Sequence, residues 1–60
     1  MKYKARSIEL LGNITQLTDN LIHQLRTANI TAQESVTLLE SMRELETQLT
    51  ELFDLEHDSR

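Results

Sequence analysis

The chain has 60 residues, which limits it to one small domain and excludes a large enzyme fold. Ten acidic and six basic residues give a net charge of -4, and this balance disfavours nucleic-acid binding because phosphate contacts need clustered Lys and Arg. With no cysteine, no proline and one glycine, the chain lacks disulfides, thiolate metal ligands and most turn-forming residues, so long helices are expected.

The first predicted helix covers about residues 3–28. At 100° per residue, seven of its apolar side chains fall within an arc of about 80°. This stripe consists of Tyr3, Leu10, Ile14, Leu17, Leu21, Leu25 and Ala28. Gly12 and Asn13 are poor helix formers, so a break with Thr15 as a new N-cap is the alternative, although the stripe keeps its phase across Gly12.

A turn is predicted at about residues 29–31, where the apolar rhythm stops. Thr31 followed by Glu34 is a capping-box pattern, which marks the start of a second helix. Asn29 tolerates the left-handed conformation in which many helices end. Because so short a connection joins neighbouring antiparallel helices, the fold class predicted is an all-α antiparallel two-helix hairpin.

The second predicted helix covers about residues 32–56. Its leucines and Met42 alternate at spacings of four and three residues, which is a bundle-type heptad pattern. The apolar patterns of the two helices together predict a hairpin core of nine residues: Leu10, Ile14, Leu17, Leu21, Leu38, Met42, Leu45, Leu49 and Leu52.

The charges at the two ends of the chain are unfavourable for isolated helices. The bases Lys2, Lys4 and Arg6 lie at a helix N-terminus. The acids Asp54, Glu56 and Asp58 lie at a helix C-terminus. Both placements oppose the helix dipole. In an antiparallel hairpin, however, residue 4 lies opposite residue 55. The basic and acidic ends are therefore expected to meet, unless both ends fray into solvent.

Four apolar residues remain outside the predicted core: Leu11, Ile22, Leu39 and Phe53. Two packed helices leave such flanking side chains partly exposed, and exposed apolar surface favours association. We expect these four residues to bind a partner, either a second copy that completes a four-helix bundle or a different helical protein. Protein binding is the predicted function in both cases.

No catalytic, cofactor or metal site is predicted, and the chain is not expected to be an enzyme. Asp19 and His23 have a spacing that allows two metal ligands, but two ligands alone do not make a site. A second group, which includes His57, lies far from His23 in a hairpin. Nothing in the sequence resembles a nucleophile with its base or a phosphate-binding glycine loop.

Acidic residues form one line along the second predicted helix, opposite the apolar seam: Glu40, Glu44, Glu51 and Asp58. This line suits a basic partner or the mimicry of a nucleic acid, whereas the simplest interpretation is a solvated face.

The chain is expected to act in the cytoplasm. No stretch approaches the roughly 20 apolar residues of a membrane span. The basic start of the chain is followed by Glu9, Gly12 and Asn13, which interrupt what would be the apolar region of a signal peptide.

Residues 21–28, Leu-Ile-His-Gln-Leu-Arg-Thr-Ala, and residues 38–42, Leu-Leu-Glu-Ser-Met, resemble the smallest subunit of the type III secretion needle chaperone. In that family a short helical hairpin packs against a larger helical-repeat chaperone, and the pair keeps the needle protein soluble. The resemblance implies a co-chaperone or assembly adaptor with apolar contacts through Leu21, Ile22, Leu25, Leu38, Leu39 and Met42.

Residues 37–40, Thr-Leu-Leu-Glu, together with Glu44 and Leu45, are similar to a stretch of Rop-type hairpins, whose dimers bind paired RNA loops. That stretch belongs to the first helix there and to the second predicted helix here, so the resemblance implies the dimeric architecture without the RNA-binding residues. The alternative function is accordingly a homodimeric regulator or phage-type inhibitor of a nucleic-acid or regulatory-protein target.

Overall fold

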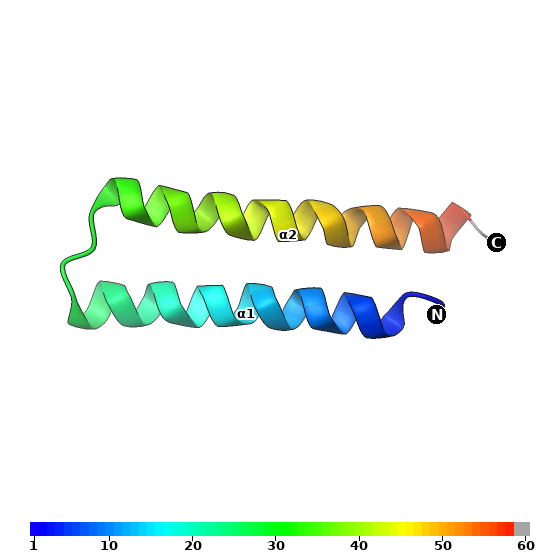
Figure 1. Ribbon diagram of the computed structural model, residues 1–60, viewed down its shortest axis with the longest axis horizontal. Coiled ribbons are helices and arrows are strands. Elements are labelled where there is room, and N and C mark those ends of the chain that lie inside the picture. The colour runs from blue at the N-terminus through cyan, green and yellow to red at the C-terminus, as the bar shows by residue number, and fades with distance from the viewer. Residues whose placement is uncertain (59–60) are drawn as a thin grey trace.

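The computed structural model describes residues 1–58 and contains two helices joined by a short turn (Figure 1). Helix α1 runs over Lys4–Thr27 and helix α2 over Ala32–Asp58. They pack side by side and antiparallel, so both ends of the chain lie at the same end of a rod with extents of 48 × 17 × 9 Å. The predicted all-α hairpin is confirmed.

In α1 and the residue before it, the side chains that are not exposed follow one heptad pattern. Their spacings alternate between four and three residues over Tyr3, Ser7, Leu10, Ile14, Leu17, Leu21 and Gln24. Leu10 is only 1% exposed and lies deepest. Ser7 is 4% exposed, and its hydroxyl has no hydrogen-bond partner. We call the seven residues from Tyr3 to Gln24 in this pattern the inner row of α1.

Helix α2 has a matching inner row with the same spacings: Ser35, Leu38, Met42, Leu45, Leu49, Leu52 and Glu56. Leu49 is its buried member and the others are half-buried. All nine residues predicted for the hairpin core belong to the two inner rows. Hydrophobic burial between these rows is the interaction that holds the hairpin together.

Leu25 and Ala28 do not lie in the core, although the 100° stripe included them. Leu25 is 60% exposed and Ala28 is also exposed, whereas Gln24 occupies the half-buried position. Packed helices keep a seam that repeats every 3.5 residues, slightly less than the 3.6 residues of a straight helix. Over six turns this difference moves Leu25 out of the seam and brings Gln24 into it.

Helix α1 continues without interruption through Gly12 and Asn13, so the alternative of a break with Thr15 as an N-cap is wrong. Both residues are exposed. A β-carbon added at Gly12 would meet no atom within 4 Å. The glycine therefore meets no packing requirement inside this helix and only weakens it.

The predicted capping box at the start of α2 is confirmed. The Glu34 amide donates a hydrogen bond to the Thr31 hydroxyl at 3.0 Å, and the Thr31 amide donates to a Glu34 carboxylate oxygen at 3.3 Å. The expectation for Asn29 is wrong, because no residue among 1–58 has a positive φ angle. Helix α1 instead ends as Ala28 turns to an extended conformation at φ -138° and ψ 159°.

Two contacts between the helices fix their register. The Tyr3 amide donates a hydrogen bond to Glu56 at 2.6 Å, and the Thr18 hydroxyl contacts the Met42 sulfur at 3.3 Å. The Glu56 carboxylate thereby serves the N-terminus of α1, which has no side-chain cap and no acid in its own first turn. Residues 1 and 58 lie at the same end of the hairpin, and Arg6 pairs within α1, with Glu9 at 2.7 Å.

Candidate protein-interaction face

Large hydrophobic side chains remain exposed on both helices. Those of α1 are Ile8, Leu11, Ile22 and Leu25, and those of α2 are Val36, Leu39, Phe53 and Leu55. Their exposed fractions range from 42% for Ile22 to 60% for Leu25. Each of these side chains keeps about half of its apolar surface in water, and this is the kind of surface that binding partners cover.

All but one of these side chains lie on the same broad side of the hairpin. On α1 they follow a second heptad row, made of Ile8, Leu11, Thr15, Thr18, Ile22 and Leu25. On α2 the corresponding row is Val36, Leu39, Arg43, Glu46, Thr50 and Phe53. A groove lined by Leu11 from α1 and by Leu39, Arg43 and Glu46 from α2 shows that both rows open to the same side. We call the two rows together the apolar face.

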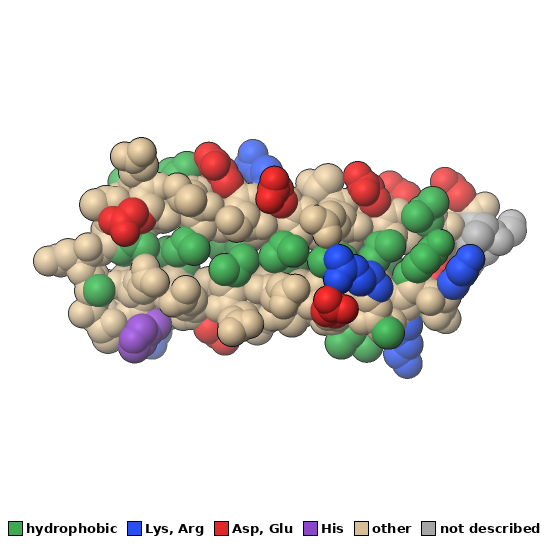
Figure 2. All heavy atoms as spheres, viewed as in Figure 1, with side chains coloured by type: hydrophobic (Ala, Val, Ile, Leu, Met, Phe, Trp, Pro, Cys, Tyr) green, Lys and Arg blue, Asp and Glu red, His purple; other side chains and the backbone are tan. Residues whose placement is uncertain are grey.

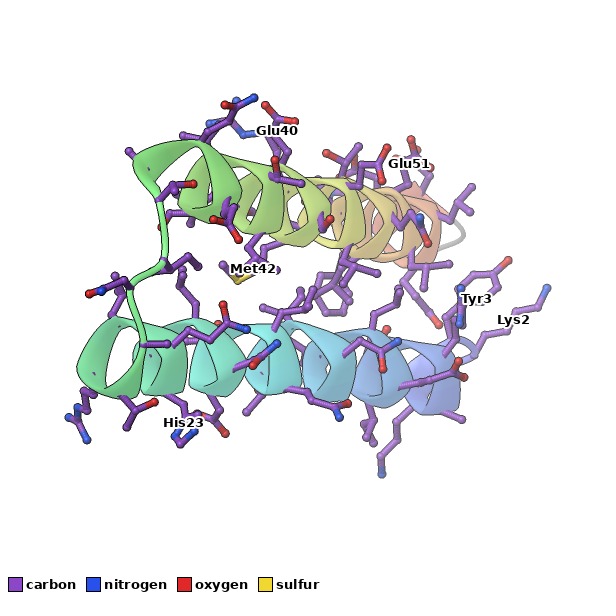
Figure 3. All side chains as sticks on the ribbon, turned by 60° about the vertical axis from the view of Figure 1, so that its left-hand side comes forward. Lys2, Tyr3, His23, Glu40, Met42 and Glu51 are labelled. Carbon is purple, nitrogen blue, oxygen red and sulfur yellow. The ribbon has the colours of Figure 1, made fainter. Side chains whose placement is uncertain are left out.

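The floor of this groove is formed by inner-row residues, namely Ile14, Met42 and Leu49. Figure 3 shows the Met42 side chain in the space between the two helices. The groove therefore has an apolar floor and apolar rims, with Arg43 and Glu46 as the charged residues in its lining. Such a surface accepts the apolar stripe of another helix.

The opposite broad side is polar. Its grooves contain Asn13 and Gln16 in the middle, and Arg6, Gln48 and Glu51 toward the open end. Leu55 lines the latter groove and is the exposed α2 leucine that does not belong to the apolar face. Figure 2 shows a broad face of this polar kind, on which hydrophobic side chains lie mainly along the line between the helices.

The four residues predicted to bind a partner all lie exposed on the apolar face: Leu11, Ile22, Leu39 and Phe53. The predicted set omitted Ile8, Leu25 and Val36, which extend the face toward both ends. Leu25 was left out because it was placed in the apolar stripe of the first helix. A search for a second heptad row, one position after the first, would have found all three residues.

The residues weighed as metal ligands stay apart or lie outward. His23 lies on the side of α1 that points away from α2 (Figure 3), and Asp19 is exposed. Within residues 1–58, no three His, Cys, Asp or Glu side chains come together as a group that could hold a metal ion.

The acidic line of α2 is solvent-exposed, as its sequence position opposite the seam predicts. Figure 3 shows Glu40 and Glu51 directed away from α1. Glu40 and Glu44 border a shallow groove that also contains Arg43, Thr47 and Gln48, so that the wall of this groove carries charge of both signs. This surface is separate from the apolar face except at Arg43, which borders both.

Neither helix, as described over residues 1–58, is long and apolar enough to cross a membrane. No family model, no curated protein and no solved structure matches this chain.

Proposed function

We propose that this chain is a non-catalytic protein-interaction module that acts in the cytoplasm as a co-chaperone or assembly adaptor. It completes a helical bundle by placing its apolar face against helices of another polypeptide chain. The observation that carries the proposal is the segregation of the exposed hydrophobic side chains, seven of which share one side of the hairpin. Scattered apolar residues are ordinary on a protein surface, whereas the gathering of so many on one side is typical of an interface.

The binding energy comes from apolar burial along the two outer rows. Helices that pack on this face run nearly parallel to α1 and α2, at the crossing angle of about 20° that is typical of four-helix bundles. Arg43 and Glu46 contribute less to affinity than to alignment, because charged groups in an apolar interface select a partner that supplies the opposite charge.

Two leucines of α2 provide a matched test. Leu39 is 53% exposed on the apolar face, and Leu55 is 52% exposed on the other side. Leu39→Ala together with Phe53→Ala is expected to weaken association by a few kcal/mol, measured by sedimentation equilibrium or by titration with a captured partner. Leu55→Ala removes the same side chain at the same exposure and is expected to leave association unchanged. Equal effects of Leu39→Ala and Leu55→Ala would contradict the assignment of the face.

A photo-crosslinking amino acid identifies what covers the face. Benzoylphenylalanine at position 53 replaces one aromatic side chain by another on the apolar face, and the same group at Thr47 lies on the outer, charged side of α2. In cells that produce the chain, position 53 is expected to give a discrete crosslinked species and position 47 none. If position 53 gives no crosslink, the proposed function is wrong.

A further inference from the structure

The apolar face is polar in its middle and apolar toward both ends. Along α2, Arg43 and Glu46 are flanked by Leu39 on the side of the turn and by Phe53 on the side of the chain ends. Along α1, Thr15 and Thr18 occupy the middle. The contacts from Tyr3 to Glu56 and from Thr18 to Met42 place Thr15 level with the midpoint between Arg43 and Glu46. One line across the hairpin therefore passes through Thr15 and between Arg43 and Glu46.

A half-turn about this line superimposes the face on itself. It places each helix antiparallel against its own copy, with the two turns at opposite ends. Ile8 then meets Ile22 of the second copy, and Val36 meets Phe53 of the second copy, whereas Leu39 lies level with Thr50 and Leu11 with Asp19. Such self-complementarity about a two-fold axis is the requirement for an isologous dimer.

The charges in the middle favour this arrangement. The half-turn places Arg43 of one copy opposite Glu46 of the other, twice per dimer. Within residues 1–58, neither of these two side chains has an ion pair in the single hairpin. In the other two-fold arrangement, with both turns at the same end, Arg43 faces the threonines of α1 and both charges stay unpaired. Reciprocal charge pairs of this kind select one register and one orientation.

The size of the face also suits a dimer. A rectangle of 48 × 17 Å covers about 800 Å², which is about the area that each partner contributes to an interface of standard size. A second copy supplies a face of the same length, width and chemistry, so that no part of the apolar surface stays uncovered.

We propose that the partner on the apolar face is a second copy of this chain, bound with the turns at opposite ends and with Arg43 of each copy paired with Glu46 of the other. This inference rests on the proposed function, since it uses the same face, and it names the protein that occupies it. The product is an antiparallel four-helix bundle in which both outer rows are buried.

Charge-reversal variants test the reciprocal pairs. Arg43→Glu and Glu46→Arg are each expected to weaken the homodimer by about tenfold or more, since each places four like charges at the centre. An equimolar mixture of these two variants is expected to form a heterodimer, and the double variant R43E/E46R is expected to dimerise like the natural chain. Glu40→Arg, on a side chain directed away from α1, is the matched control and leaves the dissociation constant unchanged.

Cysteine crosslinking tests the orientation, because the natural chain has no cysteine. Thr15→Cys places a thiol next to the proposed axis, so oxidation is expected to link most of the chain into disulfide dimers. Gln16→Cys, on the polar side, is the control and gives few. A dimer that resists crosslinking through Thr15→Cys, but yields a disulfide between Thr15→Cys and Arg43→Cys chains, has its turns at the same end and overturns the proposal.

Two measurements separate a failure of the dimer proposal from a failure of the proposed function. If the purified chain stays monomeric at high concentration while benzoylphenylalanine at position 53 crosslinks to a different protein, the dimer proposal is wrong and the proposed function stands. If the chain is monomeric and position 53 crosslinks to nothing, both are wrong. A crosslinked species of twice the mass of the chain supports the dimer and the assignment of the apolar face as an interface.

Discussion

Leu10 and Leu11 are neighbours in sequence, yet the structure gives them different tasks. Leu10 is 1% exposed in the inner row, whereas Leu11 is 46% exposed on the apolar face. Leu10→Ala therefore leaves a cavity inside each hairpin and is expected to cost about 3 kcal/mol, within the range of about 2 to 5 for buried leucines. Leu11→Ala removes a half-exposed side chain, and within a single hairpin it costs about 1 kcal/mol. Its larger expected effect is on the affinity for the partner proposed to bind the apolar face.

Urea unfolding followed by circular dichroism, at two protein concentrations about a hundredfold apart, separates these effects. For a dimer, that change in concentration shifts the apparent free energy of unfolding by about 2.7 kcal/mol. Leu10→Ala is expected to lower the unfolding midpoint equally at both concentrations. Leu11→Ala is expected to lower the midpoint mainly at the high concentration. The unfolding curves of this variant at the two concentrations then lie closer together than those of the natural chain. If Leu11→Ala costs as much as Leu10→Ala in the dilute sample, the division between inner row and apolar face is refuted.

Three further substitutions test local features of the hairpin by the same unfolding measurement. Gly12→Ala is expected to stabilise the chain by about 1 kcal/mol, because the added methyl group meets no neighbour and alanine favours helix; a loss of stability would contradict the uninterrupted α1. Ser7→Ala is expected to stabilise it by a similar amount, about 1 kcal/mol, because it removes a buried hydroxyl that has no partner. Glu56→Ala is expected to cost about 1 kcal/mol by removing the acceptor of the Tyr3 amide, while Glu51→Ala, on an exposed acid of the same helix, serves as its control and changes stability little.

The sequence was sufficient to predict the hairpin, the start of α2 and the central core. Strong local signals carried these predictions: the Thr31 and Glu34 pair has one structural meaning, and Leu38 to Leu52 repeat at an unbroken heptad spacing. The register also followed from the sequence, since the position of the turn decides which residues of two antiparallel helices are level. This register brings Glu56 to the N-terminus of α1, where it accepts the hydrogen bond from the Tyr3 amide.

The errors have a common cause in polar residues that occupy seam positions. Ser7 and Gln24 are in the inner row because the geometry of packed helices puts them there, whereas a pattern search that follows only apolar residues selects Leu25 instead. The end of α1 was also mispredicted, because Asn29 permits a left-handed conformation without requiring it. In this chain the transition to extended backbone occurs one residue earlier, at Ala28.

The distribution of apolar residues couples folding to binding. The inner rows carry polar residues toward both ends, with Ser7 and Glu56 near the chain ends and Gln24 and Ser35 near the turn, so the apolar part of the intrachain core is short. Seven large hydrophobic side chains lie outside it on one face, compared with nine in the core. A partner that binds this face binds only the folded hairpin, and it therefore stabilises the fold by an amount that grows with its concentration. The polar ends of the seam weaken the solitary hairpin, and we expect a partner on the apolar face to offset that loss of stability.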